Sequence, residues 1–381
     1  MATKQERCSK RIEKIREKMA QEGMDALMLF SPINMFYYSG YYPHRPIYPT
    51  DVFRLFPVII PRTGEPFHIM ARNVERMIKE DSWIPKRLVY DEFLIKNAEE
   101  FIAEVFRAEG LASAKIGIEE DVLVLFTMEN LKRLLPGITL AHASNMLLKA
   151  RDIKDAEEIR LIQGAIDVTI IGYETAFREL KPGRTERQVA AMCEYEMRKA
   201  GAEWFIEESQ ILAGERSKLV RARSSDNVIK QGDLILMDMA AVVNSYGSDI
   251  SRTVVVGKAT PKQKEFAKMM LDVFDKTLAY IKPGIFAWEV DKFVREEFQK
   301  HGYGPECQAH LIGHGFGLDF HENPILKPGS KVEIRPGMVF ALEPAVSDPA
   351  FGTMRFEDNV LVTETGTKVL SSKLPRELIE L

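Results

Sequence analysis

Residues Gly232–Thr253, GDLILMDMAAVVNSYGSDISRT, form the segment from which we interpret the rest of the chain. Its first arm, Leu234–Ala240, is an apolar run that is too short for a stable helix, and Ile250–Val256 is again apolar and rich in β-branched residues. Between the two arms, Asn244–Gly247 has the composition of a tight turn. The segment therefore predicts a β-hairpin.

Each arm of this hairpin carries one aspartate. If the turn is centred between Val243 and Asn244, Asp238 and Asp249 face each other, and their Cβ atoms are roughly 4.5–5.5 Å apart. Two carboxylates this close in an apolar strand pair cannot both stay ionised without a counter-charge. A divalent cation would supply it, since buried charges are normally paired or metal-bound. The alternative is that Asp249 is solvated near the turn and Asp238 has a capping role.

The second half of the chain contains an internal repeat. The tetrapeptide LKPG at Leu180–Gly183 recurs as IKPG at Ile281–Gly284, and each copy lies between two predicted helices. These four helices are predicted at residues 155–180, 185–200, 261–280 and 287–301. The repeat indicates that the chain forms the same helix–helix–hairpin unit twice.

In both repeats a carboxylate ends an apolar strand. Asp238 and Glu343 each follow a glycine by six positions, and Glu357 takes the place of Asp249 in the returning arm of the second hairpin. The second turn is centred on Ala350, so Glu343 and Glu357 are predicted to face each other. Two such units packed about a pseudo-two-fold axis would bring the four carboxylates together on one inner sheet face.

Three of the seven histidines fall within the segment His310–His321, HLIGHGFGLDFH, which lies between the two hairpins. Phe316, Leu318 and Phe320 alternate, which favours a strand that presents His314 on the face of the even-numbered residues. A glycine-rich segment of this kind, taken alone, is more commonly a loop with incidental histidines. The four carboxylates change this interpretation, because an imidazole would complete their ligand set.

The candidate metal ligands are four carboxylates and one imidazole: Asp238, Asp249, His314, Glu343 and Glu357. Such an oxygen-rich set suits Mn²⁺, Co²⁺, Fe²⁺ or Zn²⁺. Four buried carboxylates call for two divalent ions, because a single ion leaves negative charge uncompensated. Carboxylates that bridge two ions hold them about 3.5–4 Å apart, and a water between the ions becomes a hydroxide nucleophile at neutral pH.

Composition excludes several classes of protein. The 381 residues are 45% hydrophobic and 28% charged, with a net charge of −4, which gives no argument for binding to nucleic acid or to a membrane. The charged N-terminus does not resemble a secretory signal, and no apolar run approaches the ~18 residues that span a membrane. The isolated cysteines Cys8, Cys193 and Cys307 favour a reducing compartment, with the cytoplasm as the default.

Residues 1–148 alternate strands and helices, which predicts a compact α/β domain ahead of a catalytic domain at 149–381. In this first domain the predicted helices are 6–23, 74–79, 96–109 and 127–135, and the predicted strands are 26–30, 56–60, 66–70 and 115–119. The first strand is expected to break at Pro32. No catalytic constellation is recognisable in this domain.

Four motifs carry a resemblance to a known family: LILMD-x10-DISRT, HLIGHGFGLDFHENP, GMVFALEP and MRFEDNVLVTETG. They are similar to those of the pita-bread metallohydrolases, the family of prolidase, aminopeptidase P, methionine aminopeptidase and creatinase. The resemblance covers residues 150–381, and Asn34–Gly40 resembles the N-terminal domain of the prolidase, aminopeptidase P and creatinase branch. It implies an α+β chain, with a duplicated pita-bread catalytic domain and a smaller creatinase-like α/β domain. Methionine aminopeptidases usually lack that smaller domain.

The resemblance also implies a role for each matching residue. The five ligands would hold a dinuclear centre, with manganese favoured, in which Asp249 and Glu357 bridge the ions. Glu343 would in addition accept the proton of the attacking water. Arg355 would orient Glu357, clamp a carboxylate, or form no more than a structural salt bridge.

Two further histidines, His310 and His321, match residues that hold the substrate and stabilise the tetrahedral intermediate, a task that suits imidazole because its pKa lies near neutrality. Relatives with this N-terminal domain are usually dimers, so a homodimer is expected.

The chain departs from the peptidase pattern at one position. Prolidase-like relatives usually have a histidine about seventeen residues before the first metal aspartate, and Arg221 stands there in this sequence. Arginine stays protonated and cannot act as a general acid at neutral pH, but it can bind an anionic substrate group in a bidentate manner. The alternative is a benign substitution, with Arg221 turned to solvent.

These observations lead to three functional hypotheses. The leading one is a metal-dependent hydrolase of a small amide, most simply an Xaa-Pro dipeptidase acting on dipeptides. The second is a non-peptidase member of the same fold that acts on a small carboxylate-bearing molecule, such as an ectoine hydrolase, a creatinase-like amidinohydrolase or a dimethylsulfoniopropionate lyase. The third is a binding protein that has lost catalysis, which the intact ligand set disfavours.

Overall fold

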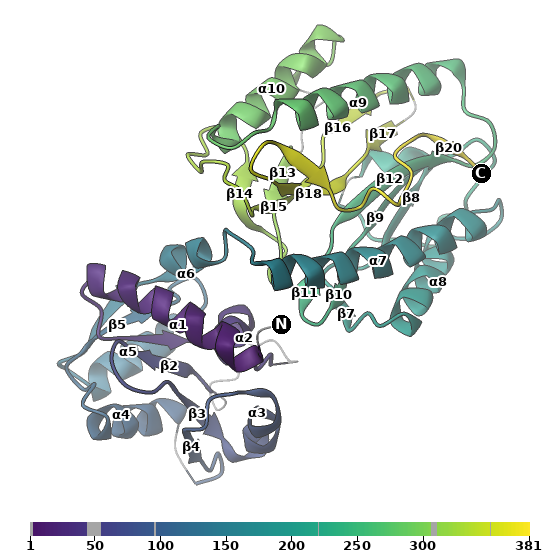
Figure 1. Cartoon of the computed structure of the whole chain (residues 1–381). Coiled ribbons are helices and arrows are strands. Elements are labelled where there is room, and N and C mark those ends of the chain that lie inside the picture. The colour runs from purple at the N-terminus through teal and green to yellow at the C-terminus, as the bar shows by residue number, and fades with distance from the viewer. Residues whose placement is uncertain (1–2, 44–54, 95–96, 220, 306–310, 351) are drawn as a thin grey trace. The chain divides into compact units, whose positions relative to one another are not determined.

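The computed structural model describes residues 3–43, 55–94, 97–219, 221–305, 311–350 and 352–381 (Figure 1). The chain divides into two compact units, Met1–Ala150 and Arg151–Leu381. The division falls two residues after the boundary that the sequence predicts. In the described ranges, no helix is both long enough and apolar enough to cross a membrane.

The N-terminal unit is built on a mixed sheet whose described strands have the order β4-β3-β2-β1-β5-β6. The strands are β1 (Ala26–Leu29), β2 (Val58–Pro61), β3 (Phe67–Ala71), β4 (Arg87–Tyr90), β5 (Lys115–Ile118) and β6 (Thr139–His142). The helices are α1 (Lys4–Gln21), α2 (Pro32–Ser39), η1 (Arg72–Val74), α3 (Glu75–Asp81), α4 (Ala98–Ala108), α5 (Leu125–Leu134) and α6 (Ser144–Ala150). β1 is antiparallel to β2 and parallel to β5, so this unit has the α/β character that the sequence predicts.

β1 ends at Leu29, ahead of Pro32 as the sequence predicted, and the segment that follows it is a helix that the sequence did not predict. The side chain of Ser31 caps helix α2 by accepting a hydrogen bond of 3.0 Å from the backbone N–H of Asn34. Pro32 occupies the first turn of this helix, where a missing N–H leaves no hydrogen bond unmade. Proline therefore ends the strand and at the same time is compatible with the start of a helix.

The C-terminal unit contains the two predicted helix pairs. These are α7 (Ala156–Glu179) with α8 (Glu186–Lys199), and α9 (Pro261–Tyr280) with α10 (Ala287–Lys300). Asp155 caps α7, because its side chain accepts hydrogen bonds of 2.9 Å from the backbone N–H groups of Glu157 and Glu158. Figure 1 shows α7 and α8 on one side of the strands of this unit and α9 and α10 on the other side.

The strands between these helices form several small sheets. They are β7 (Trp204–Phe205), β8 (Gln210–Ala213), β9 (Leu234–Met239), β10 (Ala241–Val243), β11 (Tyr246–Gly247), β12 (Ile250–Val255), β13 (Gly313–Gly315), β14 (Glu322–Leu326), β15 (Val339–Leu342), β16 (Ala345–Asp348), β17 (Gly352–Arg355), β18 (Asp358–Val362), β19 (Thr367–Val369) and β20 (Ile379–Glu380). A short helix, η2 (Gly214–Lys218), follows β8. The two larger sheets have the orders β20-β12-β9-β8 and β14-β13-β15-β18-β19, and each contains one of the duplicated hairpins.

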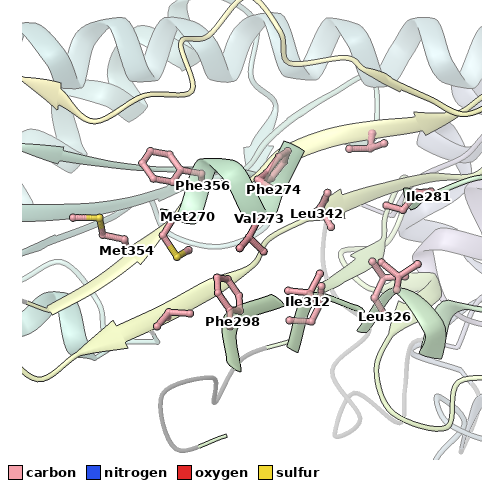
Figure 2. Packing of buried hydrophobic residues seen from close by; sticks show 14 of the residues in the cluster. Met270, Val273, Phe274, Ile281, Phe298, Ile312, Leu326, Leu342, Met354 and Phe356 are labelled. Carbon is pink, nitrogen blue, oxygen red and sulfur yellow. The ribbon is translucent and has the colours of Figure 1, made fainter. Parts of the chain in front are cut away.

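A large apolar core lies between α9, α10 and the second sheet. Figure 2 shows Met270, Val273 and Phe274 of α9 packed with Leu342 of β15 and with Phe356, which lies between β17 and β18. Val273, Phe274 and Leu342 are completely buried, and burial of each side chain of this size contributes about 1.5–3 kcal/mol. Because Leu342 directly precedes Glu343, this core fixes the strand end from which that carboxylate projects.

The first hairpin forms, but its turn is displaced by one residue from the predicted centre. Asn244 and Ser245 are the two turn residues, with φ values of 50° and 67°, and Val243 pairs with Tyr246. Asp238 therefore lies opposite Ser251 and not opposite Asp249. The two aspartates still share one face of the strand pair, as diagonal neighbours.

The second hairpin has the predicted register. Ala345 pairs with Arg355 and Asp348 with Gly352, so the turn is centred on Ala350. On the other side of the two glutamates, Leu342 pairs with Asp358 in the same register. Glu343 and Glu357 therefore stand opposite each other, whereas the corresponding aspartates of the first hairpin are diagonal.

The histidine segment contains less strand than the sequence predicted. β13 ends at Gly315, and residues 316–321 form a loop that leads into β14. Gly313 and Gly315 are necessary for the pairing. A Cβ atom on Gly313 would lie 2.2 Å from the carbonyl oxygen of Ala341, and one on Gly315 would lie 2.0 Å from that of Asn323. The alternation of Phe316, Leu318 and Phe320 therefore marks a partly buried loop and not a strand face.

Candidate metal centre and active site

Three of the predicted ligands converge at one point of the C-terminal unit. Asp249 lies just before β12, His314 is the central residue of β13, and Glu357 lies between β17 and β18. One ligand atom of each lies within 4.8 Å of the others, and each residue is at most 2% exposed. The Nε2 atom of His314 is 3.3 Å from Oδ2 of Asp249.

Glu343 lies beside this group at the end of β15. Its backbone N–H donates to the carbonyl oxygen of Ile312 over 2.9 Å, which fixes it next to the start of the histidine strand. Its Oε1 atom is 3.4 Å from Nε2 of His314. Glu343 is thus placed to contribute to the same centre.

Asp238 is connected to the group through Arg355, a residue that is 2% exposed and lies in β17. The Nη2 group of Arg355 donates to Oδ2 of Asp238 in a short ion pair. Other guanidinium nitrogens lie 3.8 Å from Oε2 of Glu343 and 3.9 Å from Oε2 of Glu357. Arg355 therefore faces three of the four predicted carboxylates as a fixed positive charge.

The electrostatics of this centre favour cations. Burial, reinforced by the neighbouring carboxylates, raises the pKa of Asp249 and of Glu357 well above their ordinary values. Burial and the charge of Glu357 raise the pKa of Glu343 to about 8. The single guanidinium of Arg355 does not balance four carboxylates, so the donor set fits divalent metal ions, which favour the ionised forms of all four.

Two side chains that the sequence did not reveal support the ligands. Ser251 lies opposite Asp238 in the ladder, and its hydroxyl donates a short hydrogen bond to Oε2 of Glu357. The side-chain amide of Asn359 donates to the carbonyl oxygen of Asp249, and its Oδ1 accepts the N–H of Asp249 over 3.3 Å. The signal available in the sequence is their spacing, since both lie two residues after a predicted ligand.

Of the two other predicted site histidines, His321 lies beside His314. The ring of His321 lies 4.2 Å from the ring of His314, centroid to centroid, and 4.6 Å from that of Phe320. Partial burial, His314 and the charge of Arg221 lower the pKa of His321 to about 4, so this imidazole is neutral at neutral pH. His310 lies outside the described residues.

Arg221 is exposed, in a loop that is attached to the metal-binding sheet. Gln210, which pairs with Asp238 in the ladder, donates from Nε2 to the carbonyl oxygen of Ala222 over 2.8 Å. The neighbouring cations Arg216, Lys218 and Arg223 have carboxylates at 3.0, 2.7 and 3.6 Å. Within the described part of the chain, Arg221 has no such ion pair, so its guanidinium is available to an anion.

Each of the two units matches a model of a known protein family. The model described as metallopeptidase family M24 matches residues 160–364, which is more than half of the chain. The model described as the creatinase/prolidase N-terminal domain matches residues 11–153.

Individual relatives match over nearly their full lengths. The chain is 33% identical to an Xaa-Pro dipeptidase of Pyrococcus furiosus and 34% identical to one of Pyrococcus horikoshii, and in each case the match covers 97% of this chain and 99% of the relative. Among solved structures, an Xaa-Pro dipeptidase from Bacillus anthracis superposes with a TM-score of 0.88 at 27% identity, covering 98% of this chain and 100% of the other. The prolidase from Pyrococcus furiosus superposes with a TM-score of 0.82 at 31% identity, covering 93% and 98%.

Proposed function

Because this chain belongs to metallopeptidase family M24, with the N-terminal domain of creatinases and prolidases, we propose that it is a dinuclear Xaa-Pro dipeptidase. The observation that carries this assignment is the buried convergence of Asp249, His314 and Glu357 in a chain that matches Xaa-Pro dipeptidases end to end. Glu343 and Asp238 would complete the set of residues that holds the metal ions together with Asp249, His314 and Glu357. When bound at such a site, divalent ions polarise a carbonyl group and lower the pKa of water toward neutrality.

We propose that the protein side chains around this centre handle the substrate and the protons. His321 is neutral at pH 7, so one ring N–H is free to donate to the oxygen of the scissile carbonyl as negative charge develops there. Glu343 accepts the proton of the attacking water and returns it to the leaving proline nitrogen. His310 is assigned a substrate-holding role by the family pattern alone.

We propose that Arg221 binds the carboxylate of the dipeptide substrate. Replacement by Ala removes a charge-assisted hydrogen bond worth about 1.5–3 kcal/mol and is expected to raise KM for an Xaa-Pro dipeptide by about 10–100-fold. An Xaa-prolinamide, which lacks that carboxylate, should be hydrolysed equally by both proteins. Arg223→Ala serves as the matched control, because Arg223 already has Glu208 as its partner. Equal losses on both substrates would contradict this role.

The activity is tested by loading the purified protein with Mn²⁺ and measuring turnover of a panel of Xaa-Pro dipeptides. Hydrolysis of these dipeptides, with much slower hydrolysis of Xaa-Ala analogues, is the expected result. Turnover of ectoine, creatine or dimethylsulfoniopropionate in place of every dipeptide would assign the non-peptidase alternative, which the free guanidinium of Arg221 also suits. Bound metal without turnover of any of these compounds would reject both assignments.

The family resemblance extends this proposal to manganese as the metal, a homodimer as the assembly and the cytoplasm as the location. Elemental analysis of the protein purified without added metal, and sedimentation equilibrium over a range of concentrations, test the first two. A monomer at micromolar concentration would contradict the dimer.

A further inference from the structure

A buried cluster of ion pairs lies directly beside the proposed active site, and none of the steps above uses it. Glu322 follows His321 and begins β14. Its Oε1 atom is 2.8 Å from Nε of Arg151, and its Oε2 atom is 3.0 Å from Nζ of Lys154. The three side chains are 1%, 6% and 1% exposed, respectively, so these charges are almost completely removed from water.

The cluster holds the loop 316–321. Glu322 pairs with Gly315 in the ladder, so it stands where the loop rejoins the sheet. The backbone N–H of Asp319 lies 3.4 Å from Oε1 of Glu322. Gly317 packs so closely that a Cβ atom there would lie 3.2 Å from both Oε2 of Glu322 and Cε of Lys154.

The same loop is also attached to the first hairpin. The backbone N–H of Gly247, in β11, donates to the carbonyl oxygen of Gly317 over 2.8 Å. The loop is therefore fixed both at its base by Glu322 and at its middle by the hairpin that carries Asp249. The rings of Phe320 and His321 in this loop both contact the ring of His314, and His321 is the one with a proposed chemical role.

A fully buried lysine is rare unless it is paired, and burial of an ion pair costs much of the attraction that it gains. A cluster of this kind therefore contributes more to a fixed geometry than to stability. We propose, building on the role proposed for His321, that Glu322 is a positioning residue, which with Arg151 and Lys154 holds the imidazole of His321 in place for the reaction. Partners behind a site residue of this kind typically change activity by about 10–100-fold when they are replaced.

A double-mutant cycle between Glu322 and His321 tests this role in the metal-loaded full-length protein. Glu322→Gln is expected to lower kcat for an Xaa-Pro dipeptide by about 10–100-fold, with a smaller change in KM. If Glu322 acts through His321, the same substitution in a His321→Ala background lowers kcat by less than about threefold. An equal loss in both backgrounds would overturn the role, because it would show that Glu322 acts independently of His321.

Two further variants separate positioning from folding. Lys154→Met leaves a one-to-one pair between Arg151 and Glu322, so it should fold and show a smaller loss with the same dependence on His321. Asp291→Asn is the matched control, because Asp291 is also a buried carboxylate, 2.9 Å from Arg295 within helix α10, and is not part of the ion-pair cluster of Glu322. It should lose stability and keep its kcat.

A readout that needs no turnover separates this inference from the proposed activity. At pH 7.5, the rate at which diethyl pyrocarbonate modifies His321, measured by peptide mass spectrometry, should rise several-fold in Glu322→Gln and stay unchanged in Asp291→Asn. An unchanged rate in Glu322→Gln would overturn the positioning role. This result holds whichever substrate the protein hydrolyses, so an absence of dipeptidase activity would reject the proposed function alone.

Discussion

Replacement of Glu357 by Gln is expected to lower kcat by roughly 1,000-fold and, at the same time, to stabilise the metal-free protein. The loss of activity follows because a neutral amide is a poor ligand for hard divalent ions and because electrostatic stabilisation at a reaction centre is commonly worth 100–1,000-fold or more. The gain in stability follows because Glu357 is buried beside other carboxylates, which raise its pKa. Without metal, removal of this charge should increase the free energy of unfolding at pH 8.

The two halves of this result are measured on the same preparation. Steady-state kinetics with a saturating metal concentration give kcat, and urea unfolding after treatment with a chelator gives the free energy of unfolding. The control Asp291→Asn should behave in the opposite way, with unchanged kcat and lower stability, because its carboxylate is matched by Arg295. A metal-free Glu357→Gln protein that is less stable than the wild type would show that the centre is not short of positive charge.

The second large effect is on the pH dependence of stability: the free energy of unfolding should fall with rising pH in the metal-free protein but not in the metal-loaded protein. Glu343 has a pKa of about 8 in the metal-free fold against an ordinary value of 4.5, so the folded state binds more protons than the unfolded state between these pH values. Its contribution to stability is complete below the ordinary value and is lost as pH rises to 8. Asp249 and Glu357 are raised in the same direction.

The informative window is pH 6.5 to 8. The pKa of His321 is lowered to about 4 and that of His68 to about 3, so both stabilise the fold increasingly as pH rises through 6.5, and above that pH their further gain is small beside the loss from Glu343. Across the window, Glu343 alone should reduce the stability of the metal-free protein by about 2 kcal/mol. The metal-loaded protein should not lose this stability, because metal binding requires deprotonated ligands and strengthens as pH rises.

Calorimetric unfolding with and without chelator at pH 6.5, 7.2 and 8.0 measures this divergence. Glu343→Gln should make the metal-free curve less steep, since the substituted side chain does not titrate while Asp249 and Glu357 still do. A metal-free wild type whose stability rises from pH 6.5 to 8 would refute the electrostatic description of the centre.

The sequence predicts the duplicated architecture well because its signals are local. The two helix pairs follow from apolar periodicity and the repeated Lys-Pro-Gly turns, and the second hairpin has its predicted centre at Ala350. The first hairpin differs by one residue because NSYG contains several possible turns. Which of them forms depends on Asn244 and Ser245 both adopting positive φ, a choice that composition does not determine.

Features that depend on distant segments could not be predicted. The loop 316–321 alternates apolar residues like a strand, but Gly317 packs on Glu322 and Lys154, and the latter lies more than 160 positions away. The sequence likewise gives Arg355 three possible roles, and only the folded chain places its guanidinium against Asp238, Glu343 and Glu357 together. The spacing of residues in the sequence can therefore identify candidate ligands. The residues that contact each ligand depend on how the two repeats pack together.

The buried guanidinium of Arg355 also bears on the order of events when the protein is made. Small zinc domains remain unfolded until their metal arrives, because nothing else organises their ligands. Here one positive charge is built into the chain, and protons bound to carboxylates such as Glu343 supply further neutralisation before any ion is present. We therefore expect the chain to fold before it binds metal, so that a chelator removes the metal without unfolding the protein.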